Sequence, residues 1–374
     1  MDTPIIGNQR IAPPIGQKNL QKNIGPTAGF SEDTKNMKIF ITGGFGYIGS
    51  AFAKEAVHKS YSVILYDSLI YEQDYKKIFK EIIGNKSHGG SANFVIGDTR
   101  NTDLLEKSLR NFRPDYILHL AELSSVYACD HNPPFTEEIN FLASKKVVDL
   151  AEKLAIPILY NSTSSLYGNQ KIMKLMKEND ILPEPTDNYC KFKLKMEQYI
   201  REKLEKNMDF RIIVFRPATV CGLSPRMRIE LLPNHFTYCA VANGVIRISE
   251  LNAFRAAIDM QDLIGGYFAV IKKGAWKNTV YNIGHHNLSK QEFAAGIQSV
   301  VKSRVVPIPD VGDLRNLQID CSLFEKEFNY KPKVSYKETV KQVAAWVKKN
   351  QKEIERTKFA GILNMSIERF MKTI

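Results

Sequence analysis

The chain has 374 residues, of which 44% are hydrophobic and 25% charged; 52 Lys and Arg against 40 Asp and Glu leave a formal net charge of +12. These values are close to those of ordinary folded proteins, which excludes a largely disordered chain, a collagen-like repeat and a small disulfide scaffold. The five cysteines are widely spaced and form no C-x-x-C pair, so neither a zinc site nor a disulfide framework is predicted.

The first 36 residues are polar, rich in Pro and Gly and without a hydrophobic period, so a disordered extension is predicted at 1–36. From residue 37 onward, short apolar runs alternate with amphipathic helical patterns. Strands are predicted at 38–42, 61–66, 93–96, 116–120, 158–161 and 211–215, and the clearest helices at 47–59, 135–154 and 187–205. This alternation predicts an α/β fold with a Rossmann-type, doubly wound parallel sheet.

After about residue 217 the alternation weakens into loops, short strands and helices. We therefore expect one domain at 37–216, which contains the sheet, and a smaller C-terminal lobe that takes up most of 217–350. An amphipathic helix at 337–350 closes this lobe, and a further helical appendage is expected at 351–374.

A glycine-rich turn joins the first predicted strand to the first helix. Gly43, Gly46 and Gly49 let the backbone approach a pyrophosphate, which then lies on unpaired N–H groups at the positive end of the helix. The next strand ends in Asp67, at the distance expected of a carboxylate that accepts the ribose hydroxyls of a dinucleotide. Because a carboxylate there repels a 2′-phosphate, NAD is favoured over NADP. A structural glycine turn followed by a solvated Asp is the alternative.

Tyr189 and Lys193 are four residues apart at the start of a predicted helix, so their side chains share one helix face. An ammonium beside a phenol stabilises the phenolate and lowers a pKa that is ordinarily near 10. Such a phenol can exchange a proton with a sugar hydroxyl while a hydride moves to or from nicotinamide. Alone the pair is weak evidence, but it follows a Ser- and Thr-rich strand end in a chain with a dinucleotide turn.

Taken together, the motifs resemble those of the extended short-chain dehydrogenase/reductases of the nucleotide-sugar epimerase/dehydratase family. The likeness runs from residue 37 to about residue 350. It rests on TGGFGYIG at 42–49, Asp67, GDTR at 97–100, HLA at 119–121, Asn140, NSTSSLYG at 161–168, Tyr189 with Lys193, RPATVCG at 216–222, and Arg255 upstream of Asp262.

The resemblance implies which residues form the site, but it does not determine which sugar and which nucleotide the substrate contains. NAD would be bound by Gly43, Gly46, Tyr47, Ile48, Gly49, Asp67, Asp98, Thr99, Leu120, Ala121, Tyr189 and Lys193. The catalytic group would consist of Thr163, Tyr189 and Lys193. The nucleotide-diphosphate sugar would be contacted by Ser164, Ser165, Asn234 and Arg255, with Arg226 and Arg228 either near the phosphates or at the surface. No metal is expected.

The family also narrows the reaction. Its sugar 4,6-dehydratases carry an Asp-Glu pair directly after the catalytic Thr, where this chain has Ser164 and Ser165, so dehydration is disfavoured. We expect an NAD-dependent epimerase that acts through a transient keto-sugar, with Tyr189 as the acid and base. A reductase or dehydrogenase for nucleotide sugars is the alternative. A catalytically silent NAD-binding protein is less favoured, because Thr163, Tyr189 and Lys193 are all present.

The resemblance further implies a homodimer in which two helices of each subunit form a four-helix bundle. The helices at 135–154 and 187–205 correspond to those helices, and each carries an apolar stripe. No nucleic-acid partner is expected, because the lysines alternate with acidic residues and no platform of aromatic and basic residues is evident. No apolar run approaches the ~18 residues of a membrane span, so no membrane partner and a cytoplasmic location are expected.

Overall fold

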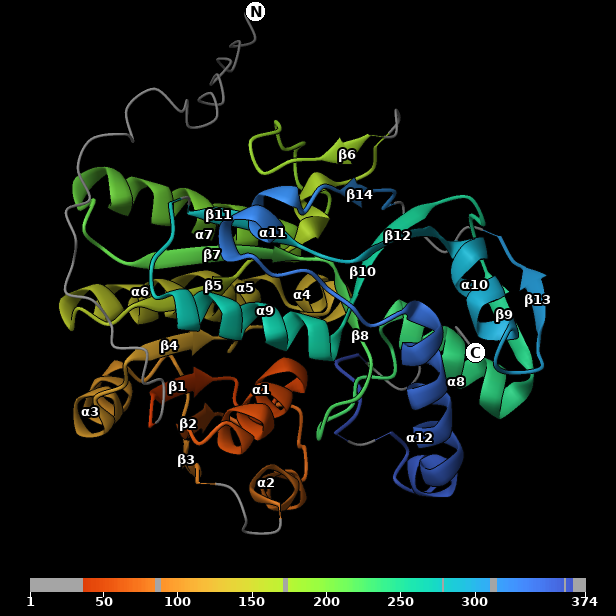
Figure 1. Ribbon diagram of the computed structural model, residues 1–374, viewed down its shortest axis with the longest axis horizontal. Helices are drawn as coiled ribbons and strands as arrows, with labels where there is room; N and C mark the ends of the chain where they lie inside the picture. The colour runs from red at the N-terminus through yellow and green to blue at the C-terminus, as the bar shows by residue number, and fades with distance from the viewer. Residues whose placement is uncertain are drawn as a thin grey trace, which may run out of the picture.

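The computed structural model describes residues 36–84, 89–170, 174–277, 279–309, 315–359 and 361–365. A central sheet with helices on both faces forms the larger part, and a smaller lobe lies beside it (Figure 1). The predicted extension at 1–36 lies, apart from Asn36, outside the described residues.

The central sheet is entirely parallel, with the strand order β11-β7-β5-β4-β1-β2-β3. Its strands are β1 (Lys38–Thr42), β2 (Ser62–Asp67), β3 (Ser91–Ile96), β4 (Tyr116–His119), β5 (Ile158–Asn161), β7 (Ile212–Pro217) and β11 (Val280–Ile283). The predicted doubly wound Rossmann-type sheet is therefore confirmed. The order reverses between β1 and β4, the switch point beside which such sheets bind their ligands.

Helices cover both faces of the sheet, which is why its inner strands are continuous apolar runs. The helices of the two layers are α1 (Tyr47–His58), α2 (Tyr75–Ile83), α9 (Met260–Lys273) and α11 (Ser322–Phe328) on one face, and α3 (Thr102–Phe112), α6 (Ser144–Lys153) and α7 (Asn188–Lys206) on the other. Each layer of helices encloses a hydrophobic core against the sheet. Ile39 and Ile41 point into the core under α1, α2, α9 and α11, and Phe40 points into the core under α3, α6 and α7, because side chains alternate between the two faces along a strand.

The helix predicted at 135–154 is divided into three parts. It consists of α5 (Pro133–Glu137), a π-helical segment η1 (Glu138–Ala143) and α6. Within the π-helical segment, the buried Asn140 side chain donates a hydrogen bond to the Leu123 carbonyl and accepts one from the Leu123 amide, both over 2.8 Å. The segment thereby fixes the loop that follows β4, and that loop forms part of the site described below.

The smaller lobe contains two short sheets and three helices around a core of its own. Its elements are β8 (Thr219–Cys221), α8 (Leu232–Asn243), β9 (Val245–Ile248), β10 (Phe254–Asp259), β12 (His286–Ser289), α10 (Lys290–Gln298), β13 (Arg304–Pro307) and α12 (Tyr336–Arg356). The division expected near residue 217 is less clean than the sequence suggested. Residues of α9 and β11 lie within 217–350 but belong to the sheet domain, because β11 pairs with β7 and α9 covers one face of the sheet.

The remaining elements are short. They are α4 (Val126–His131), the 3-10 turn η2 (Ser164–Tyr167), and the paired strands β6 (Leu175–Met176) and β14 (Gln318–Ile319). Helix α12 continues past residue 350 to Arg356, and the described residues after it, 357–359 and 361–365, form turns and bends. The expected boundary at 350 therefore falls inside a helix, and residues 366–374 of the expected appendage lie outside the described part.

Candidate active site

A cavity of about 1130 Å³ lies between the ends of the sheet strands and the smaller lobe. Its walls come from the glycine turn, the ends of β2, β4 and β5, the start of α7, and the lobe around β9 and β10. Residues that are far apart in the sequence thus meet at the switch point of the sheet.

The glycine turn has no room for side chains at two of its positions. Gly43 has a φ of +68°, and a Cβ atom there would lie 2.8 Å from the carbonyl carbon of Leu120. A Cβ atom on Gly49 would lie 2.3 Å from the Gly43 carbonyl oxygen. Helix α1 begins directly after Gly46, and no side chain caps its first turn. The turn therefore presents backbone N–H groups to the cavity, which fits a dinucleotide pyrophosphate.

Asp67 ends β2 and lies in the cavity wall with only 7% of its surface exposed. Its oxygens accept hydrogen bonds from the amides of Phe45 (2.9 Å) and Leu69 (2.8 Å). Burial raises the pKa of this carboxyl, while these amide hydrogen bonds and the nearby Arg226 oppose the rise. The side chain is thus fixed in place beside the glycine turn, where the sequence predicted a contact to ribose.

The other predicted NAD contacts also line the cavity: Ile48, Asp98, Thr99, Leu120 and Ala121. The amides of Leu120 and Ala121 donate to Thr42 Oγ1 over 3.1 and 3.3 Å, which ties the end of β4 to the end of β1. Tyr47 lines the cavity as well, but its hydroxyl is turned away and donates to the Gly222 carbonyl (2.7 Å).

The predicted catalytic residues come together at one side of the cavity. Thr163 caps the turn after β5, and its Oγ1 accepts a hydrogen bond from the Ser165 amide (3.1 Å). Tyr189 lies in the first turn of α7 and is hydrogen-bonded to Thr163. The Lys193 ammonium lies 5.9 Å from the centre of the Tyr189 ring and donates to the Asn161 carbonyl. Helical spacing therefore places phenol and ammonium side by side, as the sequence predicted.

Burial is the largest influence on the Tyr189 phenol and raises its pKa well above the ordinary value. The hydrogen bond with Thr163 acts in the opposite direction, because it stabilises the phenolate. Cys190 and Cys129, once ionised to thiolates, and the carboxylate of Glu122 raise the pKa further. In the protein alone, Tyr189 is therefore protonated near pH 7 and able to donate.

Three of the four predicted substrate contacts line the same cavity. Ser164 and Ser165 lie directly after Thr163, and Arg315 donates to Ser165 Oγ over 3.4 Å. Arg255 is 4% exposed and lies on β10, with one guanidinium nitrogen donating to the Phe254 carbonyl (3.0 Å). A hydroxyl-lined end next to Tyr189 and a guanidinium on the lobe suit a sugar and a phosphate, respectively.

Asn234, the fourth predicted contact, does not line the cavity. Its side chain is 1% exposed, accepts a hydrogen bond from the Gly222 amide (3.0 Å) and donates to the Tyr47 hydroxyl (3.0 Å) and the Arg228 carbonyl (2.9 Å). Asn234 thus joins α8 to α1 and the loop after β8. The residue type was uninformative, since an amide that contacts a ligand and one that pairs buried backbone groups look the same in a sequence.

Several ionic side chains of the cavity wall were not predicted as site residues, and for Arg226 and Arg228 both a place near the phosphates and a place at the surface were considered. Arg226 and Arg228 are 2% and 7% exposed and line the cavity, so they are not surface residues. Other unpredicted ionic side chains of the wall are Glu122, Asp130, Asp187, Glu230, Arg247, Lys290 and Arg315. No spacing in the sequence marks them, because these seven residues come from seven separate segments of the chain.

The described residues contain no group of three or more His, Cys, Asp or Glu that could hold a metal ion. All five cysteines are free, and four of them are buried. Within the same described part of the chain, no helix is both long and apolar enough to cross a bilayer.

Comparison with known proteins agrees with this site. Residues 39–284 match the model of the NAD dependent epimerase/dehydratase family. A bifunctional UDP-glucose 4-epimerase and UDP-xylose 4-epimerase of Pisum sativum is 23% identical over 342 residues, covering 84% of this chain and 97% of the relative.

Two solved structures have the same fold. One is a UDP-glucose 4-epimerase of Stenotrophomonas maltophila with bound NAD and formylated UDP-arabinopyranose; its TM-score is 0.73 at 19% identity, and the match covers 86% of this chain and all of the other. The other is a dTDP-glucose 4,6-dehydratase of Bacillus anthracis in complex with NAD, with a TM-score of 0.72 at 21% identity over 84% of this chain and 98% of the other.

The fold, the glycine turn and the Tyr–Lys pair define a dinucleotide-dependent enzyme of the short-chain dehydrogenase/reductase type. The family match covers well over half of the chain, so the chain belongs to the NAD dependent epimerase/dehydratase family. The predicted family and cofactor, NAD, are confirmed.

Proposed function

We propose that the protein is an NAD-dependent nucleotide-sugar 4-epimerase, with a UDP-sugar as the first substrate to test. The observation that carries this proposal is the meeting of Thr163, Tyr189 and Lys193 with the glycine turn and Arg255 in one cavity. The names of the relatives support the same reaction, because epimerases that act on UDP-glucose and UDP-xylose are among them.

The residues divide the work between binding and proton transfer. Arg255 holds the diphosphate of the substrate, since a guanidinium matches phosphate oxygens. Thr163 hydrogen-bonds the reacting sugar oxygen beside Tyr189 and keeps it within reach of the phenol. The Lys193 ammonium stabilises the phenolate of Tyr189, which takes the proton from this oxygen; the neutral phenol then returns the proton when the hydroxyl is formed again. NAD, when bound, supplies the reversible hydride acceptor that makes a transient keto-sugar possible.

Dehydration is a poorer explanation of this site than epimerisation. Elimination of water needs a carboxyl acid and base next to the catalytic Thr, and Ser164 and Ser165 occupy those positions in the cavity wall. Glu122, an unpredicted carboxylate of the cavity wall, forms an ion pair with Lys193. A dehydrogenase or reductase uses the same residues as an epimerase and differs only in releasing the oxidised or reduced product.

One experiment separates these reactions. The purified protein is analysed for its bound cofactor and then offered UDP-, GDP-, CDP- and dTDP-sugars, with and without added NADH. An epimerase converts the sugar without net change in NADH, whereas a reductase consumes NADH stoichiometrically. Tyr189→Phe should reduce turnover by at least about 100-fold while NAD stays bound, because only the proton transfer is lost. Unchanged turnover in this variant would show that the catalytic assignment is wrong.

The proposal includes a cytoplasmic location and a homodimer. Free cysteines, four of them buried, are typical of a reducing compartment and support the location.

A further inference from the structure

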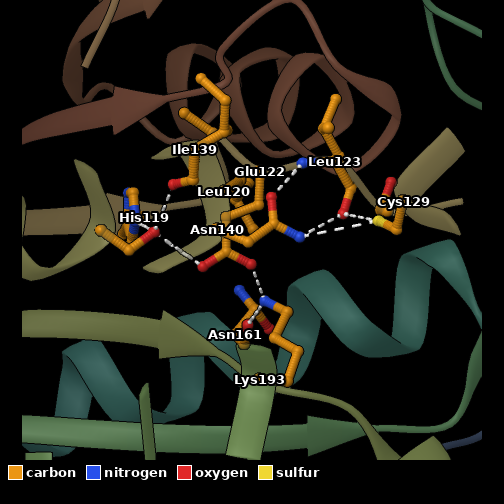
Figure 2. Close-up of polar contacts among 12 residues, drawn as sticks. His119, Leu120, Glu122, Leu123, Cys129, Ile139, Asn140, Asn161 and Lys193 are labelled. Carbon is orange, nitrogen blue, oxygen red and sulfur yellow. Dashed lines mark hydrogen bonds and ion pairs between the residues drawn. The ribbon is translucent and has the colours of Figure 1, made fainter. Parts of the chain in front are cut away.

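Glu122 is a buried carboxylate in the cavity wall, in the loop that follows β4. Its side chain and that of Lys193 are each 5% exposed, and the two form an ion pair through Glu122 Oε2 and Lys193 Nζ. Figure 2 shows Lys193 held between Glu122 and the carbonyl of Asn161. The lysine of the Tyr–Lys pair thus has an anionic partner inside the site.

A line of buried polar groups fixes this carboxylate. Ser144 Oγ donates to Glu122 Oε1 over 2.9 Å, and His119 Nε2 lies 2.9 Å from the same Oγ. Burial first, and then the charge of Lys193, lower the pKa of His119 to about 3, so its ring is neutral near pH 7. Ser144 has one hydroxyl hydrogen and two acceptors for it, Glu122 Oε1 and, 3.2 Å away, the Ile139 carbonyl. We therefore assign the ring proton of His119 to Nε2, which donates to Ser144 Oγ. Nδ1 then accepts from Thr42 Oγ1, 2.6 Å away.

Few charges besides this pair act on the Tyr189 phenol. Burial raises the pKa of the Cys129 thiol to about 12 and that of the Cys190 thiol further, so both are uncharged near pH 7. The titratable groups that act on Tyr189 are the neutral Cys190, Cys129 and Tyr160. The charged ones are Glu122, Lys193 and, on the lobe side, Arg228. Burial and the Thr163 hydrogen bond act on the phenol most strongly, and among the charged groups Glu122 and Lys193 act in opposite directions on a phenolate here.

We propose that Glu122 is a positioning residue for the Tyr189–Lys193 pair, an inference that rests on the proposed function. Its carboxylate holds the Lys193 ammonium at the Asn161 carbonyl, and its negative charge cancels part of the stabilisation that Lys193 gives to the Tyr189 phenolate. Tyr189 keeps its proton to a higher pH than it would beside an unpaired lysine. It is thereby ready to return the proton to a keto-sugar oxygen at neutral pH.

The charge of Glu122 is tested by the pH dependence of kcat/KM. Glu122→Gln keeps the shape and removes the charge, so the midpoint of the rising limb should fall by about one pH unit or more. Glu122→Ala should shift it in the same direction and serves if the Gln variant does not fold. Glu122→Asp retains the charge, and Ser144→Ala removes the hydroxyl between Glu122 and His119 but leaves the carboxylate charge in place; both should keep the midpoint of the wild-type protein. A uniform loss of rate at every pH in Glu122→Gln would overturn the proposal.

A second readout does not need turnover. The ultraviolet absorbance of ionised tyrosine is followed against pH in the NAD-bound protein, and subtraction of the Tyr189→Phe curve isolates Tyr189. Its midpoint should be lower in Glu122→Gln than in the wild-type protein. Equal midpoints would overturn the proposal. If no variant converts any nucleotide sugar, the proposed function fails, while this titration still decides the role of Glu122.

Discussion

Buried polar side chains in this protein are held in place by pairing, and the pairing decides which of them are charged. Arg216, for example, is 5% exposed and meets the Glu197 carboxylate through Nε (3.0 Å) and Nη2 (2.6 Å). His119 is 1% exposed, and the hydrogen-bond partners of its two ring nitrogens are the hydroxyl groups of Thr42 and Ser144, while the Glu122 carboxylate lies 3.9 Å from Nε2. Burial keeps this ring neutral. A neutral buried histidine costs nothing at neutral pH, whereas protonating it in place is unfavourable.

The neutral state of His119 predicts an acid-sensitive fold. Its pKa is about 3 in the folded protein and near 6.5 in the unfolded chain, so below pH 6.5 the unfolded chain takes up the proton and the folded one does not. The stabilisation is fully present above pH 6.5 and is lost as the pH falls towards 3, at about 1.4 kcal/mol per pH unit. Between pH 7 and 5 the wild-type protein should lose about 2 kcal/mol more than His119→Gln, which does not titrate.

Urea unfolding at pH 7, 6 and 5 measures both free energies of unfolding. The comparison uses the slope of the free energy of unfolding against pH, so a lower stability of His119→Gln at pH 7 does not affect it. All other titrating groups are common to both proteins and contribute equally to both slopes. Parallel slopes would contradict the neutral assignment of His119, and with it the direction of the hydrogen bonds to Ser144 and Thr42.

At the scale of elements, the sequence predicted those features that depend on neighbouring residues alone. The turn at Gly43 and Gly49 was predictable because steric contact with the backbone excludes any other residue there. The buried strands were predictable because apolar runs of four to six residues between helices pack in parallel sheets. Strand β11 was missed because its run, Val280–Ile283, contains Asn282, whose amide pairs with the carbonyls of Met176 and Asp320. Both carbonyls belong to segments far from β11 in the sequence, so the pattern of residues around Asn282 does not predict these hydrogen bonds.

The turns after α12 form another element that the sequence did not specify. Arg226, in the loop after β8, is 2% exposed; it donates to the Gly361 carbonyl (2.9 Å), the Leu363 carbonyl (3.4 Å) and Asn364 Oδ1 (2.5 Å). The Asn364 amide in turn donates to Glu230 (2.9 Å). Because Asn364 and Met365 also line the cavity, the end of the described chain forms part of its wall.

Removal of this segment is therefore expected to destabilise the protein. A chain that ends at Arg356 leaves the Arg226 guanidinium buried beside Arg228 without these acceptors, at a cost of about 3 kcal/mol. A chain that ends at Met365 retains every contact given above and is the matched control. Thermal unfolding of the two chains makes the comparison. A Tm in the shorter chain equal to that of the control would show that Arg226 finds other partners.

At the scale of the whole molecule, the cavity is a product of the tertiary fold. The glycine turn, Thr163 and the Tyr–Lys pair lie on one domain and were found because their spacing is local. The cations on the lobe side, such as Arg247 and Lys290, come from segments that the fold brings together across the cavity, and each is an ordinary surface residue as far as the sequence tells. The sequence therefore predicts the chemistry of the reacting end better than the recognition of the nucleotide.

The predicted homodimer belongs to this scale, and the structure changes the argument for it. Most of the apolar stripe residues that suggested a four-helix bundle are packed within the subunit: Ile139, Val147, Leu150, Phe192, Met196 and Ile200 are at most 8% exposed. Leu142, in the π-helical segment, is 46% exposed and lies on the outer side of the same helical layer. If two subunits pair through this layer, Leu142 is the apolar side chain available for the contact.

Light scattering coupled to size exclusion tests this prediction at micromolar concentration. We expect the wild-type protein to elute with twice the mass of the chain. Leu142→Glu should weaken the association at least about tenfold, because a charge replaces an apolar contact at the interface. Met208→Glu is the matched control, since Met208 is also exposed (68%) but lies beyond the end of α7. A monomeric wild-type protein would contradict the dimer, and equal association in both variants would move the interface away from these helices.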